Sequence, residues 1–210
     1  MTIDIDPLET QHSDLDDSFR RHAFEILRKG VALEASEIVA SSPSEGDSGQ
    51  RTLEVLLQRG MAELDGDKLV GIDGLSLRPT QHRMNLGDGA LFTWCAADAV
   101  GIPVALDEDA EVITTCPHCS SEIVIAVQQG EPQAGEVIVL WLPTSSCSHV
   151  VSRFCPEVNL FCSRSHLEEW RSQGDRGEGR ILSVEEVAEL GRQWWAYLRP
   201  NGGEQGAHVR

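Results

Sequence analysis

A cysteine and an aspartate stand three residues apart in the stretch "LFTWCAADAVGIP" (residues 91–103), and a thiol and a carboxyl group could together hold and move a proton. The alanines beside them favour a short helix, which Gly101 and Pro103 are expected to end. Because residues three apart share one face of a helix, Cys95 and Asp98 are predicted to lie side by side. Spacing alone leaves open the alternative of a buried cysteine beside an exposed aspartate.

The remaining cysteines also gather in the second half of the chain. All six, at positions 95, 116, 119, 147, 155 and 162, lie between residues 95 and 162. In a reducing compartment such a set favours metal binding or thiol chemistry over a disulfide framework. Cys155, between an aromatic residue and a proline, is expected at the end of an extended segment. Cys162 lies in an apolar stretch and is predicted to be a core residue.

The segment "TTCPHCSSE" holds the most recognisable metal-binding spacing, Cys116-x2-Cys119. Four-coordinate zinc needs two more ligands, and Cys147 with His149 in "SSCSHV" could supply them, which predicts a structural zinc site. Two alternatives remain open: a redox-active cysteine pair, which suits this position between two strands poorly, and a turn whose thiols bind nothing.

Composition limits the classes of partner. The chain has 210 residues with 40% hydrophobic and 24% charged side chains, which are values of a globular protein. Its formal net charge of -17 opposes binding to nucleic acids and to anionic membranes. No apolar run is long enough to span a membrane, and the acidic N-terminus resembles no signal peptide. We therefore expect a cytoplasmic protein.

The distribution of helix and strand signals predicts an α+β fold. Helices are expected over residues 18–30, 32–42 and 50–60, followed by a hairpin over 61–80, which is the order of a winged helix. With few basic residues there, packing or dimerisation is favoured over DNA binding. Strands over 111–115, 122–127 and 136–142 predict a mixed, mostly antiparallel sheet core with flanking helices over 165–172 and 181–198. Ser183 and Glu186 form a capping box for the last helix.

These elements suggest a division of the chain into four parts. Residues 1–17 are predicted to be a disordered acidic tail and residues 200–210 a flexible tail. Between them we expect a winged-helix-like domain over 18–80 and an α/β domain over 81–199 that carries the cysteines.

Several motifs together resemble the organomercurial (alkylmercury) lyases. They are Gly-Leu-Ser-Leu-x-Pro-Thr at residues 74–80, His82, the box Leu-Phe-x-Trp-Cys-Ala-x-Asp at 91–98, and Arg-Phe-Cys at 153–155. The resemblance covers about residues 20–198. The chain departs from the pattern at Pro156, where family members often have a second cysteine. Cys116 falls near a family cysteine thought to be structural, whereas Cys119, Cys147 and Cys162 look like additions that leave room for an extra metal site.

The resemblance implies an enzyme that cleaves the carbon–mercury bond of R-Hg⁺ to give RH and Hg²⁺. It implies a winged-helix-like N-terminal region before a mixed α/β core. The catalytic set would be Cys95, Asp98 and Cys155, which would also bind the Hg²⁺ product. No metal cofactor is implied, and small thiols or a mercuric reductase would accept the Hg²⁺. The alternative is a non-catalytic cytoplasmic protein that binds or senses Zn²⁺ or Hg²⁺ through thiols.

The residue types suit the implied reaction, because Hg²⁺ is a soft cation that prefers thiolates, and a carboxyl group can protonate carbon. A helix N-terminus would lower the pKa of Cys95, and a neighbouring carboxylate would raise it. We therefore expect Cys95 and Asp98 to share one proton. An apolar wall, built by Trp94, Phe92 or Phe154, would favour the protonated carboxyl group.

Overall fold

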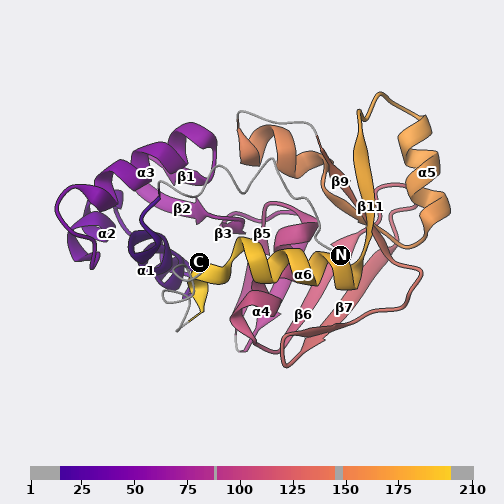
Figure 1. Cartoon of the computed structure of the whole chain (residues 1–210), viewed down its shortest axis with the longest axis horizontal. Coiled ribbons are helices and arrows are strands. Elements are labelled where there is room, and N and C mark those ends of the chain that lie inside the picture. The colour runs from indigo at the N-terminus through magenta and orange to yellow at the C-terminus, as the bar shows by residue number, and fades with distance from the viewer. Residues whose placement is uncertain (1–14, 88, 145–148, 200–210) are drawn as a thin grey trace, which may run out of the picture.

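Three helices begin the part of the chain that the computed structural model describes, residues 15–87, 89–144 and 149–199 (Figure 1). They are α1 (Asp17–Leu27), α2 (Ala35–Ser41) and α3 (Ser48–Arg59). The Asp16 carboxylate caps α1 by accepting hydrogen bonds from the backbone N–H groups of Ser18 and Phe19. The acidic tail predicted over residues 1–17 overlaps this helix, since Asp16 is its N-cap residue and Asp17 its first residue. The rest of both predicted tails, residues 1–14 and 200–210, lies outside the described residues.

An eight-stranded sheet follows, in the order β1-β2-β3-β5-β4-β6-β7-β8, and all its neighbouring strands are antiparallel. Its strands are β1 (Ala62–Asp65), β2 (Lys68–Ile72), β3 (Leu75–Ser76), β4 (His82–Leu86), β5 (Gly89–Thr93), β6 (Ala110–Thr115), β7 (Glu122–Gln128) and β8 (Glu131–Gln133).

The hairpin predicted over residues 61–80 is present as β1, β2 and β3, so the order of three helices and a hairpin is confirmed. The winged-helix arrangement itself stays a prediction. The domain boundary predicted after residue 80 falls between β3 and β4, two strands of one sheet, and the division into domains also stays a prediction.

A second, three-stranded sheet has the order β10-β9-β11 and is also antiparallel. Its strands are β9 (Val139–Pro143), β10 (Asn159–Phe161) and β11 (Gly179–Ser183). A π-helical turn, η2 (Val150–Phe154), and a 3-10 turn, η3 (Cys155–Glu157), lead into β10, which is followed by α5 (Arg164–Ser172). The strands predicted near residues 111–142 and the helix over 165–172 are confirmed as β6, β7, β9 and α5.

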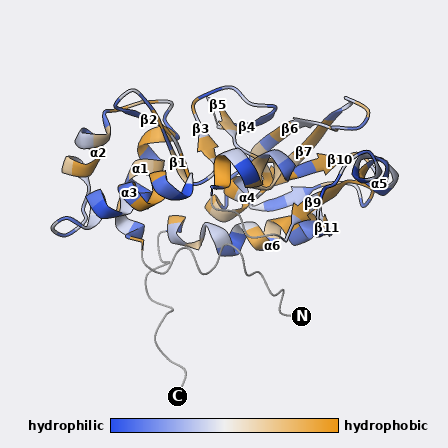
Figure 2. Cartoon of the chain, turned by 90° about the horizontal axis from the view of Figure 1, so that it is seen from above, coloured by the Kyte–Doolittle hydropathy of each residue, from blue (hydrophilic) through white to orange (hydrophobic). Residues whose placement is uncertain are grey.

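The helix α4 (Ala96–Leu106) lies between the eight-stranded sheet and α6 (Val184–Trp194), as Figure 2 shows. Ten of its 11 residues are buried, so it is the centre of the core. The two helices cross where Gly191 meets Gly101, and a Cβ built on Gly191 would clash with the Cα of Gly101. The predicted capping box of Ser183 and Glu186 starts α6, and η4 (Ala196–Leu198) follows it.

The helix predicted within residues 91–103 differs at both ends from α4. Residues 91–93 belong to β5, and the helix runs past Gly101 and Pro103 until Asp107, which adopts a left-handed conformation (φ 58°). Proline inside a helix costs about 3 kcal/mol. Burying Ile102 and Val104 contributes about 1.5–3 kcal/mol each, so packing outweighs the local stop signal. No helix within the described ranges is long and apolar enough to cross a membrane.

Candidate active site

The N-terminus of α4 holds Cys95 and Asp98 together. Cys95 is the N-cap residue, with an extended backbone, and its N–H donates a hydrogen bond of 2.9 Å to Oδ2 of Asp98. Asp98 is the third residue of the helix, so the pair forms a capping box in which a thiol takes the place of the usual hydroxyl. The predicted proximity of the two side chains is therefore confirmed, and both are buried.

Cys155 reaches this pair from a distant part of the chain. It lies where η2 passes into η3, two turns that precede β10. The backbone N–H of Ala96 donates to the carbonyl of Val158 (3.2 Å), and the N–H of Val158 donates to the carbonyl of Cys155 (3.1 Å). These bonds fix the turn against the start of α4. The Sγ atoms of Cys95 and Cys155 and a carboxylate oxygen of Asp98 consequently all lie within 4.8 Å of one another.

Burial controls the protonation of this group. It raises the pKa of Asp98 to about 7, and the negative charge of Asp73 adds to the rise. Hydrogen bonds from the thiol and the backbone N–H of Cys95 act in the opposite direction and lower this pKa. Burial also raises the pKa of Cys95, and the charge on Asp98 adds to that effect, while a hydrogen bond with Cys155 opposes it. Of the two opposing effects expected on the pKa of Cys95, the raising effect of the Asp98 charge acts together with desolvation, and the net shift is upward. Near neutral pH, Cys95 keeps its proton and Asp98 is poised to gain or lose one.

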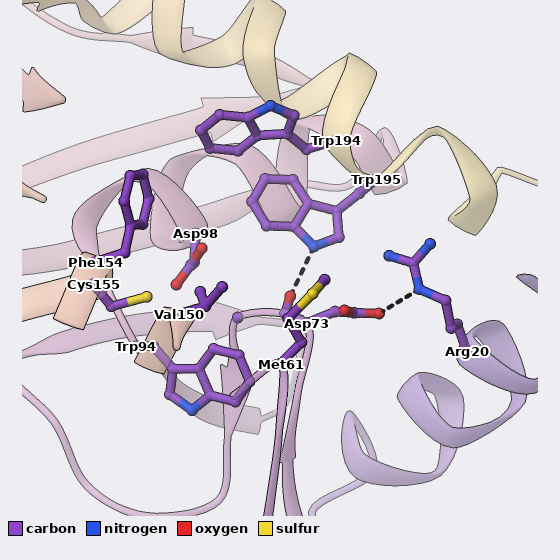
Figure 3. Close-up of a pocket in the computed structure, with 11 residues that line it drawn as sticks. Arg20, Met61, Asp73, Trp94, Asp98, Val150, Phe154, Cys155, Trp194 and Trp195 are labelled. Carbon is purple, nitrogen blue, oxygen red and sulfur yellow. Dashed lines mark hydrogen bonds and ion pairs between the residues drawn. The ribbon is translucent and has the colours of Figure 1, made fainter. Parts of the chain in front are cut away.

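A small, mainly apolar cavity of about 50 Å³ opens beside the group. Figure 3 shows the Cys155 sulfur beside the Asp98 carboxylate at this cavity. Of the expected aromatic walls, Trp94 and Phe154 line it, and Phe92 does not. The lining residues are Arg20, Met61, Asp73, Gly74, Trp94, Asp98, Val150, Phe154, Cys155, Trp194 and Trp195.

The β2–β3 turn supports the pair from the other side of the cavity. Asp73 accepts hydrogen bonds from Nε of Arg20 (2.9 Å) and the hydroxyl of Tyr197 (2.7 Å), and its carbonyl accepts one from Nε1 of Trp195 (2.8 Å). The next residue, Gly74, has φ +93°, and a Cβ there would lie 2.7 Å from Cγ of Asp98. Only glycine therefore fits at this position without displacing the carboxyl group.

Sequence reasoning missed this support, because its members come from α1, the β2–β3 turn and the C-terminal segment. The motif at residues 74–80 was the one available signal, since it begins at the glycine that touches Asp98. Other residues of the matched motifs act in the scaffold. The hydroxyl of Thr80 donates to the carbonyl of Thr93 (2.6 Å), and Nδ1 of His82 lies 2.7 Å from Oγ1 of Thr114. Burial lowers the pKa of His82 to about 4, so this imidazole is neutral.

A second group of sulfur and nitrogen atoms lies around the β6–β7 turn. Cys116 and Cys119 are joined there by Cys162 and His166, and the four ligand atoms all lie within 4.8 Å of one another. The predicted partner His149 is elsewhere: its ring lies against Gly60, and Nδ1 is 2.7 Å from the Ser152 hydroxyl. Cys147 lies outside the described residues.

The assignments around this group need two corrections. Cys162, predicted as a core residue, is half-buried and stands beside Cys119, with their Sγ atoms 3.6 Å apart. His166, which the sequence left without a role, has Nδ1 3.0 Å from Sγ of Cys162. The missed signal was the Cys162-x3-His166 spacing at the start of α5. None of the five described cysteines forms a disulfide.

Protonation differs sharply within this second group. Hydrogen bonds from the hydroxyl and backbone N–H of Ser121 lower the pKa of Cys119 to about 6. Partial burial, together with the neighbouring thiols, raises the pKa of Cys162 to about 12. The exposed thiol is therefore the more easily ionised of the two.

Comparisons with known proteins agree with one another on the family. The family model described as alkylmercury lyase matches residues 75–196. Alkylmercury lyase of Staphylococcus epidermidis is 26% identical over 190 residues, covering 89% of this chain and 86% of the relative. The alkylmercury lyase of Pseudomonas putida is 32% identical over 152 residues, covering 70% of this chain and 69% of the relative.

A solved structure has the same fold. The crystal structure of the mercury-bound form of MerB2 superposes with a TM-score of 0.82 at 24% identity, covering 91% of this chain and 97% of that one. The family match spans both α4 with Cys95 and Asp98 and the turn with Cys155. The chain belongs to the alkylmercury lyase family of enzymes.

Proposed function

We propose that this protein cleaves the carbon–mercury bond of R-Hg⁺ by protonolysis, with Cys95 and Cys155 as mercury ligands and Asp98 as the proton carrier. The observation that carries the proposal is the approach of the two buried Sγ atoms and the carboxylate oxygen within 4.8 Å beside a cavity that Cys155 and Asp98 line. Two soft ligands and one acid are the groups that this reaction needs.

Binding begins at the cavity, which Cys155 and Asp98 line and where Cys95 lies within reach of both. Mercury replaces the thiol proton of each cysteine as a sulfur–mercury bond forms. The raised pKa of Cys95 keeps this thiol protonated until mercury arrives. Asp98, with a pKa of about 7, can accept one of the released protons, and the other leaves to solvent.

Bond cleavage then needs the proton on Asp98. Electron density from two thiolates makes the carbon bound to mercury more basic, and the carboxyl group delivers its proton there. The carbon–mercury bond breaks, a carbon–hydrogen bond forms, and Asp98 returns to the carboxylate. In total, R-Hg⁺ and two thiols give RH, a bis-thiolate Hg²⁺ complex and one proton. A positioned acid of this kind contributes about 10²- to 10⁴-fold to the rate.

Product release requires competing thiols, because the two cysteines hold Hg²⁺ tightly. We propose that small thiols or a mercuric reductase accept the ion, and a cytoplasmic location would suit these acceptors. The cavity of about 50 Å³ suits a small alkyl group on mercury, since one water-sized site needs about 10–15 Å³. Methylmercury is accordingly the substrate that we propose to test first.

The test measures methane released from methylmercury chloride with excess thiol. We expect turnover by the unmodified protein and a loss of at least about 10²-fold in Cys95→Ser, Cys155→Ser and Asp98→Asn. Asp107→Asn, a change at the exposed end of the same helix, is the matched control and should keep full activity. Turnover that survives in Cys155→Ser or Asp98→Asn would refute the assigned roles.

A further inference from the structure

The second cysteine group has the shape of a metal site. The Sγ atoms of Cys119 and Cys162 are 3.6 Å apart, and Sγ of Cys116 is 3.9 Å from Nδ1 of His166. Zinc bonds to sulfur at about 2.3 Å and to nitrogen at about 2.0–2.1 Å, so tetrahedral ligands lie about 3.5–3.8 Å apart. The separation of 3.0 Å between Sγ of Cys162 and Nδ1 of His166 needs to widen by about half an ångström.

The backbone of the β6–β7 turn arranges its two thiols for such a site. The N–H of Ser120 donates to the carbonyl of Cys116 (2.9 Å), and the N–H of Cys116 donates to the carbonyl of Ser121 (2.9 Å). Ser120 takes a left-handed conformation (φ 60°), which closes the turn. The two cysteines of the Cys-x2-Cys spacing therefore face the same point, as in a zinc knuckle.

The other two ligands come from the start of α5. Ser163 caps this helix by accepting a hydrogen bond from the N–H of His166 (3.2 Å), which fixes His166 in the first turn. Cys162 precedes the cap and directs its sulfur to the same place. His118 lies nearby but belongs to a different interaction: its Nε2 is 3.2 Å from Glu169, and its ring packs against His166 at 4.6 Å between centroids.

We propose that Cys116, Cys119, Cys162 and His166 bind one Zn²⁺ ion in a closed, tetrahedral, structural site. Four protein ligands leave no open position for a substrate, which distinguishes this site from a catalytic one. Cys119 is exposed and gives the ion a path of entry, while Cys116 is buried and anchors the site to the core.

The position of the site explains what zinc would do. It joins the β6–β7 end of the eight-stranded sheet to the β10–α5 junction beyond the second sheet. The segment that it fixes begins only a few residues after Cys155, so the ion would hold in place the turn that carries this cysteine. Removing it should therefore loosen the fold around the cavity without removing any group that lines it.

The experiment measures zinc in the full-length protein purified under reducing conditions, by mass spectrometry of the metal. We expect about one Zn²⁺ per chain, and at least a tenfold loss in Cys119→Ser and His166→Ala. His166→Cys should restore binding, because a thiolate replaces the imidazole at the same point. His118→Ala is the matched control within the group, and Cys95→Ser tests the other site; both should keep full zinc content.

Two further readouts make the result independent of enzymatic activity and of folding defects. Co²⁺ in place of Zn²⁺ should give the visible absorption of a tetrahedral thiolate complex in the unmodified protein and lose it in Cys162→Ser. Chelation should lower Tm by about 5 °C or more. The proposal is overturned if the reduced protein binds no zinc, if zinc content is unchanged in the ligand variants, or if Cys119 and Cys162 are found as a disulfide in the purified, untreated chain.

Discussion

The raised pKa of Asp98 predicts that Asp98→Asn makes the protein more stable above neutral pH. Asparagine has nearly the same shape, and its side-chain oxygen can still accept the hydrogen bond from the N–H of Cys95. What the substitution removes is the negative charge, which burial and the charge of Asp73 make unfavourable in the folded state. The substitution also removes the acid that the proposed reaction needs. The variant should therefore be more stable and less active than the unmodified protein.

The magnitude follows from linkage. The carboxyl group titrates near 3.8 in its ordinary environment and at about 7 in the folded protein. Between these values the folded state binds more protons than the unfolded state, so this group costs stability as pH rises from about 4 to 7. A shift of about three pKa units corresponds to about 4 kcal/mol, fully expressed above pH 7 and absent below about pH 4.

The assay is urea unfolding of both proteins at about pH 5 and pH 8. Other titrating groups are common to both proteins, so the difference between their free energies of unfolding isolates Asp98. We expect Asp98→Asn to gain about 3 kcal/mol relative to the unmodified protein between these two pH values. Asp73→Asn is the control, and it should lower the free energy of unfolding, because it removes the charge that pairs with Arg20. The reasoning would be refuted if Asp98→Asn did not raise the free energy of unfolding at pH 8, or if it raised it equally at both pH values.

Three further substitutions test the surroundings of the site. Gly74→Ala places a methyl group 2.7 Å from Cγ of Asp98, and methane release should fall at least about 10²-fold; near-normal turnover would contradict this role. Asp73→Ala removes the buried carboxylate that pairs with Arg20 and leaves this guanidinium only the exposed carboxylate of Asp17, so the free energy of urea unfolding should fall by about 3–5 kcal/mol; a loss below about 1 kcal/mol would contradict this role. Gly191→Ala forces α6 away from α4 and should lower Tm by several degrees in calorimetry; an unchanged Tm would show that the crossing can relax.

Local patterns predicted the parts of the structure that local forces decide. The three N-terminal helices, the hairpin and the capping box of α6 follow from residues close together in the sequence. The proximity of Cys95 and Asp98 is of the same kind, although its cause is a capping box and not the shared face of a helix interior. The end of α4 was missed because burial against the sheet and α6 overrides Gly101 and Pro103.

Long-range proximity was beyond the reach of spacing. That Cys155 meets Cys95 came from resemblance to a family, since the contact depends on a backbone bond between Ala96 and Val158. The carboxylate of Asp73 and its cationic partner Arg20 come from separate elements with no shared motif. Of the second metal-ligand group, only Cys116 and Cys119 were predicted as ligands. Cys162 was assigned to the core, and His166 was given no role.

The most direct test of the proposed mechanism separates mercury binding from carbon–mercury cleavage in a single turnover. Unmodified protein and Asp98→Asn, each in excess over methylmercury and without added thiol, are compared for bound mercury and for methane formed. We expect both proteins to bind all of the added methylmercury through their unchanged cysteines. The unmodified protein should release one methane per mercury, and Asp98→Asn should release it at least about 10²-fold more slowly. Equal methane release by both proteins would contradict the assignment of Asp98 as the proton carrier.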